Sequence, residues 1–241
     1  VVGSRSGDNL IGANGHDEVI GLEGNDFINA NAGDDLVVGN EGDDTINAGT
    51  GDDTLVGGEG RDLLDGGGGT NTVNYSEYAQ TVRIRLDSGF AVDGDGDRDT
   101  LVNISNAVGG GNADTMRGDN NANQFNGLEG GDRMVSLGGD DTLFGEAGND
   151  TMRGGLGNDR LVGGINNDLM FGNGQNDTLE GGRGADRMFG DTGSDVLIGG
   201  ANKDILSGGF GRDLFIFETL ADSAANGTNS DVITDFETGL D

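Results

Sequence analysis

Apolar residues recur at one fixed position of a nine-residue unit along most of this 241-residue chain. The unit begins as GSRSGDNLI and tiles residues 3–74, then resumes as GGGNADTMR and tiles residues 109–216 without insertion or deletion. The eighth position is apolar in every unit. A short period kept over this length predicts a repeat architecture in which each unit stacks on its neighbours.

The apolar column alternates in the second block. All five methionines of the chain occupy every second unit, and Phe or Leu fills the units between them. They are Met116, Met134, Met152, Met170 and Met188. Like residues therefore return every eighteen positions, which makes two units one coil. Each unit is expected to supply a six-residue turn and a strand of about three residues, whose middle side chain points inward. We predict a flattened parallel β-solenoid with one methionine wall and one leucine wall.

Two polar columns fix the turn. The fourth position is mostly Gly, with Asn112, Asn121, Asn166, Asn202, Ser6 and Gln175 as exceptions. Gly and Asn tolerate positive φ best, so this column predicts a left-handed turn residue, which Ser6 and Gln175 fit poorly. The sixth position is Asp in all units but two, where Asn71 and Asn123 stand.

Composition narrows the chemistry. The chain has 44 acidic and 13 basic residues, a formal charge of −31, and neither Cys nor Pro. The charge argues against nucleic acid as a partner, and the missing Cys excludes disulfides and thiolate metal sites. No apolar run approaches the eighteen residues that a membrane span needs. His16 is the only histidine, so a HExxH zinc site is impossible, and at a fifth position we expect it on the surface. We expect no enzyme activity in this segment. The sequence leaves open whether its parent protein is a protease, a lipase or an epimerase.

Stacking the sixth-position acids requires a cation to offset the repulsion between their carboxylates. Neighbouring coils lie about 4.8 Å apart, so sixth-position carboxylates stacked in columns would repel one another along both edges. The apolar seam is thin for a chain this long, and we expect the bare chain to be unfolded or loosely collapsed. Calcium takes six to eight oxygen ligands in tolerant geometry, and Gly-rich turns expose backbone carbonyls beside the carboxylates. Pairing each unit with the second one after it gives about six pairs in the first block and ten in the second.

The units GGEGRDLLD, GGLGNDRLV and GGRGADRMF resemble the G-G-x-G-x-D-x-U-x nonapeptide of repeats-in-toxin (RTX) proteins. The resemblance implies an all-β, right-handed parallel β-roll with eighteen residues per coil and calcium in the turns, on the order of ten ions or more. Carried over residue by residue, it implies a metal-binding role for the sixth-position acids. They are Asp8, Asp17, Asp26, Asp35, Asp44, Asp53, Asp62, Asp114, Asp132, Asp141, Asp150, Asp159, Asp168, Asp177, Asp186, Asp195, Asp204 and Asp213.

Some positions depart from the family pattern. At Asn71 and Asn123 the pattern predicts weak or missing sites. Glycine is also often absent from the first two positions of units in the first block, which weakens the prediction of site geometry there.

The order of segments predicts two repeat blocks, 3–74 and 109–216, joined by an irregular β insert, 75–108, and followed by a truncated cap, 217–241. In the insert, TVRIRLD alternates like a half-buried strand, with Val82, Ile84 and Leu86 on one face, and Gly89 suggests a bend. The acidic loop DGDGDRD leaves open both an additional cation and a solvated loop. In the cap, we expect Phe215, Phe217, Val232, Ile233 and Phe236 to close the open end of the solenoid.

The passage TLVNISNAVGGGNADTMRGDNNANQFNG, which runs from the insert into the second block, resembles the lead-in to the repeats of serralysin-type modules and of other secreted RTX proteins, and DVITDFETGLD resembles the strand that closes such modules. In the family, DVITDFETGLD would be followed by another strand and a secretion signal, so we expect the chain to stop short of both.

The leading functional prediction is a calcium-dependent folding and secretion module of a secreted or cell-surface protein of a Gram-negative bacterium. By family habit it would leave the cell by type I secretion, through machinery that recognises the missing C-terminus. The alternative is a polysaccharide-binding or adhesin-type surface-layer module, in which outward arginines such as Arg133, Arg160 and Arg187 contact an acidic glycan. A catalytic domain is the remaining alternative.

Overall fold

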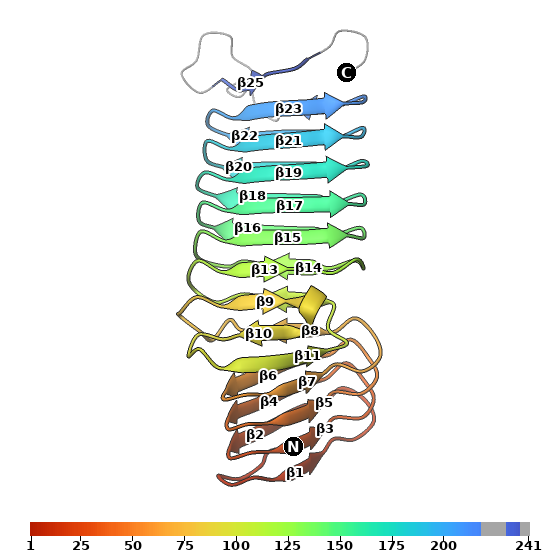
Figure 1. The fold of residues 1–241 in the computed structure, drawn as a ribbon, viewed down its shortest axis with the longest axis vertical. Helices are drawn as coiled ribbons and strands as arrows, with labels where there is room; N and C mark the ends of the chain where they lie inside the picture. The colour runs from red at the N-terminus through yellow and green to blue at the C-terminus, as the bar shows by residue number, and fades with distance from the viewer. Residues whose placement is uncertain (218–229, 237–241) are drawn as a thin grey trace. The chain divides into compact units, whose positions relative to one another are not determined.

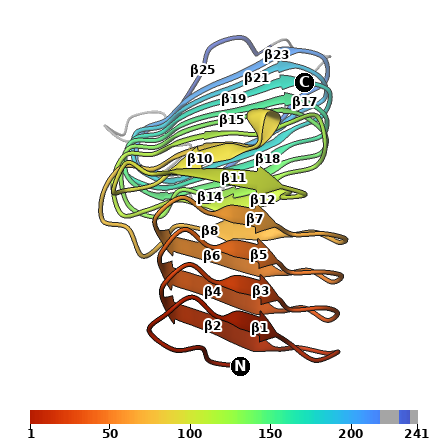
Figure 2. The same cartoon turned by 60° about the horizontal axis from the view of Figure 1, so that its bottom comes forward.

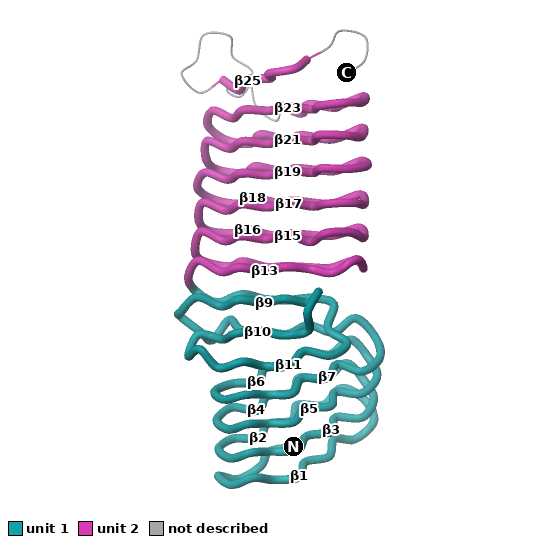
Figure 3. Tube along the Cα trace, viewed as in Figure 1, with its two compact units in different colours: residues 1–111 teal, residues 112–241 magenta. Residues whose placement is uncertain are grey.

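The structure is a computed structural model, and it describes residues 1–217 and 230–236. It divides into two compact units, Val1–Gly111 and Asn112–Asp241, shown in teal and magenta in Figure 3. The described residues form strands and turns, with one 3-10 turn, η1 (Leu86–Ser88), as their only helical element. No helix in these residues is long and apolar enough to cross a membrane.

The second unit is built from two parallel sheets, whose strands stack as rungs in Figure 1. The methionine sheet contains, in order, β13 (Thr115–Arg117), β15 (Arg133–Gly138), β17 (Thr151–Leu156), β19 (Leu169–Gly174), β21 (Arg187–Thr192), β23 (Ile205–Phe210) and β25 (Val232–Ile233). The leucine sheet contains β14 (Gln124–Asn126), β16 (Thr142–Ala147), β18 (Arg160–Ile165), β20 (Thr178–Arg183), β22 (Val196–Ala201) and β24 (Leu214–Ile216).

The eighth-position residues form the core of this unit, as the alternation predicted. Met116 is in register with Met134, and Met134 with Met152, so one methionine lies directly over the next. Leu143 is paired with Leu161 in the same way on the facing sheet. All of these side chains are fully buried. The parallel β-solenoid with an eighteen-residue coil is therefore confirmed.

The first unit repeats the plan and adds the insert (Figure 2). One of its sheets contains β1 (Asn9–Ile11), β3 (Phe27–Asn29), β5 (Thr45–Asn47) and β7 (Leu63–Asp65), and the other contains β2 (Glu18–Glu23), β4 (Leu36–Glu41), β6 (Thr54–Glu59) and β8 (Thr72–Asn74). The insert contributes β9 (Arg83–Arg85), β10 (Phe90–Val92), β11 (Arg98–Val102) and β12 (Asn106–Val108). β11 and β12 continue the two sheets in parallel beside β7 and β8, whereas β10 is antiparallel to β9 and β11.

The insert folds as its alternation predicted. Val82 and Ile84 are fully buried, and Arg83 between them is exposed. The chain reverses after β9 through Gly89, which has φ of 65°. In the cap, β25 is paired with β23, and the rings of Phe215 and Phe236 lie 6.4 Å apart. The rest of the predicted cap, residues 218–229 and 237–241, lies outside the described residues.

Strands in the second unit are longer than predicted. Most span six residues, because the ladder resumes at the second and third positions of the next repeat after skipping its first position. The second position takes positive φ as well as the fourth, with 90° at Leu137 and 115° at Gly155. The prediction of positive φ at the fourth position is confirmed in most units, and even Gln175 adopts φ of 77° there. Ser6, Asn112, Asn121 and Gly184 are the exceptions. Because the turn between strands has only three residues, the chain needs positive φ at the second position as well as at the fourth. Leu can occupy the second position, at a cost in backbone strain.

Candidate metal centres in the turns

Beyond the first coil of each unit, the sixth-position carboxylates accept a hydrogen bond from the backbone of the coil before them. The backbone N of Asp150 donates to Oδ1 of Asp168 at 2.8 Å, and the backbone N of Asp168 donates to Oδ1 of Asp186 at 2.8 Å. Repetition of this bond builds two columns of side chains in each unit. Within the described residues, the eighteen-residue spacing gives six bonded pairs in the first block and ten in the second.

The columns gather all of the predicted metal-ligating residues. In the first unit they run Asp8–Asp26–Asp44–Asp62 and Asp17–Asp35–Asp53–Asn71. In the second unit they run Asp114–Asp132–Asp150–Asp168–Asp186–Asp204 and Asn123–Asp141–Asp159–Asp177–Asp195–Asp213. Asp8 and Asp17, in the first coil, are half-buried, and the other acids are buried.

The second carboxylate oxygen, Oδ2, has no hydrogen-bond partner in most of these side chains. It is buried and unpaired in Asp26, Asp35, Asp44, Asp53, Asp62, Asp132, Asp141, Asp150, Asp159, Asp168, Asp177, Asp186, Asp195 and Asp204. An orphaned buried acceptor costs about 1–3 kcal/mol, and more when it is charged. Native proteins keep such groups paired, so an orphaned oxygen repeated at one register indicates a ligand.

The first-position glycine leaves room for that ligand. A Cβ added to Gly163 would lie 2.4 Å from Oδ2 of Asp168 and 2.6 Å from the carbonyl oxygen of Gly181. At Gly181 the corresponding distances, to Asp186 Oδ2 and the Gly199 carbonyl oxygen, are both 2.5 Å. Two oxygens from successive coils therefore face the same small space beside each of these glycines.

Three units carry a larger residue at this first position. Ala30, Ala48 and Ser136 are fully buried there, and Asp35, Asp53 and Asp141 nevertheless keep the bond to the preceding coil. The Ser136 hydroxyl donates to the carbonyl oxygen of Gly154 at 2.5 Å. The column therefore continues through these units, while the space beside Oδ2 is smaller than at a glycine.

Burial raises the pKa of the column carboxyls Asp44, Asp53 and Asp62 in the first unit and of those from Asp132 to Asp204 in the second. Loss of water is the main cause, and it raises the pKa of Asp168 to about 7 and that of Asp177 to about 8 from a model-compound value of 3.8. Hydrogen bonds from the preceding coil oppose the shift, and neighbouring acids add to it. The pKa of Asp62 is raised to about 8 for the same reasons. Ionisation of these carboxyls at neutral pH is therefore costly unless positive charge lies beside them.

The donor set fits a hard cation. The polar atoms nearest to Gly163 and Gly181 are carboxylate and carbonyl oxygens, which are the ligands that calcium prefers. No group of three or more acidic, His or Cys side chains within residues 1–217 and 230–236 could hold a metal ion by itself, so backbone carbonyls must complete any site. Bound calcium would supply the positive charge that the buried carboxylates lack.

A family model described as the RTX calcium-binding nonapeptide repeat (4 copies) matches most of the chain. The matched stretches are residues 2–37, 11–46, 38–73, 126–161, 144–179, 154–188, 162–197 and 180–215. The chain belongs to the RTX calcium-binding repeat family. No curated protein matches the chain. RTX repeats bind calcium and form a β-roll, so the module is a calcium-binding structural unit.

The RTX columns of the first unit end in neutral hydrogen-bond donors. The backbone N of Asp62 donates to Oδ1 of Asp99, and the Tyr75 hydroxyl donates to Oδ2 of Asp99 at 2.6 Å. The Asn71 amide donates to the carbonyl oxygen of Asn103 at 3.1 Å. A hydroxyl and an amide therefore lie where the other rungs have an orphaned oxygen, and the weak or missing site expected at Asn71 stays a prediction.

Asp99 and Asp231 extend the columns beyond the repeat. Asp204 donates its backbone N to Oδ1 of Asp231 at 2.9 Å, although the two residues are 27 positions apart. Sequence reasoning missed both, because it searched only at a spacing of eighteen. The signal available was that each follows a break in the repeat and stands just before a short apolar run, Leu101–Val102 for Asp99 and Val232–Ile233 for Asp231.

The acidic loop of the insert uses its carboxylates for internal bonds. Oδ1 of Asp93 accepts hydrogen bonds from the backbone N of Asp95, Gly96 and Asp97 at 2.8–3.0 Å. Oδ2 of Asp93 accepts one from the Tyr78 hydroxyl. Asp93 therefore organises the loop and Asp99 belongs to a column, so the alternate acids of this loop do not converge on one point.

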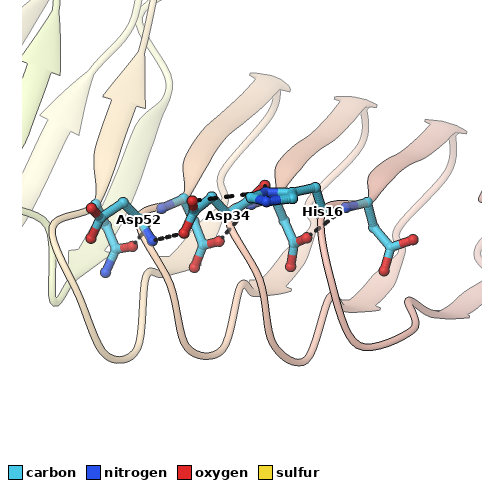
Figure 4. Close-up of polar contacts among 7 residues, drawn as sticks. His16, Asp34 and Asp52 are labelled. Carbon is cyan, nitrogen blue, oxygen red and sulfur yellow. Dashed lines mark hydrogen bonds and ion pairs between the residues drawn. The ribbon is translucent and has the colours of Figure 1, made fainter.

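A second, outer ladder follows the fifth position of the turns. Oδ1 of Asp34 accepts a bond from the backbone N of Asp52 at 2.9 Å, and Nδ1 of His16 lies 3.0 Å from the Asp34 carbonyl oxygen. Figure 4 shows these three residues on successive turns. The side chains of His16 and Asp34 are largely exposed. His16 is therefore a surface residue, as predicted.

Proposed function

We propose that this RTX module folds when calcium binds in its turns, and that a larger secreted protein uses it as a folding and structural unit outside the cell. The observation that carries the proposal is the repeated, buried and unpaired Oδ2 of the sixth-position acids. Calcium provides the missing partner for each of these oxygens. The ions, on the order of ten or more, are shared between successive coils.

The energetics favour a chain that stays open without calcium. Two ionised carboxylates about 5 Å apart repel by about 3 kcal/mol at an effective dielectric constant of 20. Each column places several acids in succession, and the buried apolar seam contributes one side chain per nine residues. Extracellular calcium modules work at dissociation constants of about 10⁻⁴–10⁻³ M, so the cytoplasm would leave the sites empty.

Membership of the family supports the cellular part of the proposal, because RTX repeats are typical of secreted bacterial proteins. An unfolded module suits passage through a type I secretion channel, and folding on the far side would follow from the higher calcium concentration. In this proposal the module itself is not catalytic, and any enzymatic activity belongs to other parts of the parent protein.

A calcium titration followed by circular dichroism tests the proposal. The strand signal should rise steeply from chelator to millimolar calcium, while equal magnesium should produce little change because it demands tighter octahedral geometry. Isothermal titration calorimetry under the same conditions would count the ions. A strand signal that is equally strong in chelator and in calcium would refute calcium-dependent folding. Fractionation of cells that express the parent protein would test export separately.

A further inference from the structure

The outward face of the methionine sheet carries positive charge in a strongly acidic protein. On strands β13 to β23, the residues on either side of each inward eighth position include no acid, and Asp191, further along β21 and bonded to Asn173, is the one acid in these strands. Six of these residues, which we call the arginine face, are Arg117, Arg133, Arg153, Phe171, Arg187 and Phe189. The corresponding residues of β1, β3, β5 and β7 in the first unit include no arginine.

Two of the arginines are held in place by a pair of stacked rings. Phe171 and Phe189 stack with centroids 5.1 Å apart and an interplanar angle of 13°. The guanidinium of Arg153 lies 4.1 Å from the Phe171 centroid, and that of Arg187 lies 5.9 Å from the Phe189 centroid. Such contacts restrict both guanidiniums before any ligand arrives, which lowers the entropy cost of binding.

These guanidiniums also lack anionic partners of their own. In the part of the chain that the structure describes, no carboxylate lies within ion-pair distance of Arg133, Arg153 or Arg187. Arg160, on the leucine sheet, differs because its guanidinium forms an ion pair with Glu180 at 3.0 Å. The sequence grouped Arg160 with Arg133 and Arg187, but the structure places it on the other sheet.

The net charge of the chain does not oppose a positive face here. Many acids of the second unit lie in the buried columns, where the proposed calcium ions would neutralise them. The present inference rests on that proposal, because the face exists only when the solenoid is folded. In the calcium-loaded unit, the outward arginines are then no longer outweighed by the column acids that precede these strands in the turns.

We propose that the arginine face binds an acidic polysaccharide, laid across the strands of the methionine sheet. The arginines lie one or two ladder steps apart, which is about 5–10 Å along the stack. A chain with roughly one charge per sugar matches that spacing, whereas duplex DNA carries a charge about every 1.7 Å and would be repelled by the rest of the protein. An extended peptide is disfavoured, because the backbone groups of these strands are already paired within the sheet.

The test uses the full chain in calcium with short oligosaccharides as probes. Binding of oligouronates, of sulfated heparin oligosaccharides and of neutral dextran is measured by calorimetry. The variant Arg153→Gln/Arg187→Gln should weaken binding of the acidic probe at least about tenfold, which corresponds to about 1.4 kcal/mol. The matched control, Arg160→Gln on the leucine sheet, should leave the affinity within about twofold. Phe171→Leu should weaken binding by removing the platform under Arg153. Circular dichroism in calcium checks that every variant is folded.

The binding results identify the class of ligand or overturn the proposal. Preference for oligouronates would identify carboxylated sugars as the ligand, and preference for heparin would identify sulfated ones. Equal binding of dextran, tighter binding of single-stranded DNA or polyglutamate, or equal losses in the Arg160 control would overturn the proposal. A wild-type chain that stays folded in chelator would refute calcium-dependent folding, yet it would still support the arginine face if it bound the acidic probe.

Discussion

Replacing Asp168 by Asn removes one carboxylate from the middle of a column while preserving its shape. The amide oxygen can still accept the bond that the backbone N of Asp150 donates to Oδ1 of Asp168 at 2.8 Å. The chain already uses Asn at this register, because Oδ1 of Asn71 accepts the backbone N of Asp53. The substitution therefore tests the role of the second oxygen. We expect it to stabilise the metal-free fold and to destabilise the calcium-loaded fold.

The structure sets the size of both effects. In the metal-free fold, burial raises the pKa of Asp168 from 3.8 to about 7. At pH 8 this shift corresponds to at most about 4 kcal/mol of destabilisation, which screening near the turn reduces to about 1–2 kcal/mol. Asn removes that cost. In calcium, loss of one site forfeits about 2.7 kcal/mol when the ion is at a hundredfold excess over its dissociation constant.

Chemical denaturation followed by circular dichroism would measure the expected gain in stability of the metal-free fold and the expected loss in the calcium-loaded fold. The metal-free state is examined in chelator with trimethylamine N-oxide, which favours compact states, and the loaded state in millimolar calcium. Asp140→Asn is the matched control, because Asp140 is exposed at a fifth position and accepts a bond from the backbone N of Asn158. It should change either stability by less than about 0.5 kcal/mol. If Asp168→Asn were destabilising to the same extent in both conditions, Oδ2 would be a structural group and the metal argument would fail.

Three further predictions follow from the turns and the insert. Gly181→Ala should weaken calcium binding at its site at least about tenfold, because the added Cβ would lie 2.5 Å from Asp186 Oδ2. The control Gly174→Ala should leave calcium binding unchanged, because the nearest atom to its Cβ is 3.4 Å away. Calorimetry on both variants measures the difference. Lowering the pH should favour the metal-free fold, because burial raises the pKa of Asp168 to about 7 and that of Asp177 to about 8. Both carboxyls bind a proton more tightly in the folded state than in the unfolded state. The stability that they contribute to the metal-free fold is therefore fully present below about pH 4 and is lost as the pH rises through 6–8. A strand signal in chelator that failed to grow between pH 8 and pH 4.5 would contradict this sign. Tyr75→Phe should destabilise the first unit by about 1–3 kcal/mol by leaving Asp99 Oδ2 buried without its donor. Thermal unfolding of the variant should show this loss both in calcium and in chelator with trimethylamine N-oxide.

The period alone predicted much of the fold. A column that alternates Met and Leu every nine residues defines the coil length, the two walls and the register, because only stacked coils place Met116 over Met134. The glycine column likewise predicted the positive φ that the fourth position takes in most units. The same reasoning did not find positive φ at the second position, because Leu22, Leu128 and Leu137 occupy it in some units and hide the backbone requirement.

The candidate sites were predictable wherever the eighteen-residue spacing held. Composition and spacing identified the sixth-position acids, and their burial and hydrogen bonds follow from the stacking. Asp99 and Asp231 were missed because an insert and a segment outside the repeat return the chain to the column at other spacings, 37 and 27 residues. The hydroxyl of Tyr75 could not be assigned either, since only the folded insert brings it to Asp99. These features depend on three-dimensional closure rather than on periodicity.

The stack of five methionines makes the module sensitive to the order in which it meets oxidant and metal. Each thioether is fully buried in the folded coil, so peroxide should reach it only before the coil closes. Oxidation to the sulfoxide adds a polar oxygen to a side chain that has only apolar neighbours above and below it. A chain that was oxidised while still extended would therefore be unable to rebuild the wall, and sulfoxide mapping by mass spectrometry would record which coils had closed at the moment of exposure.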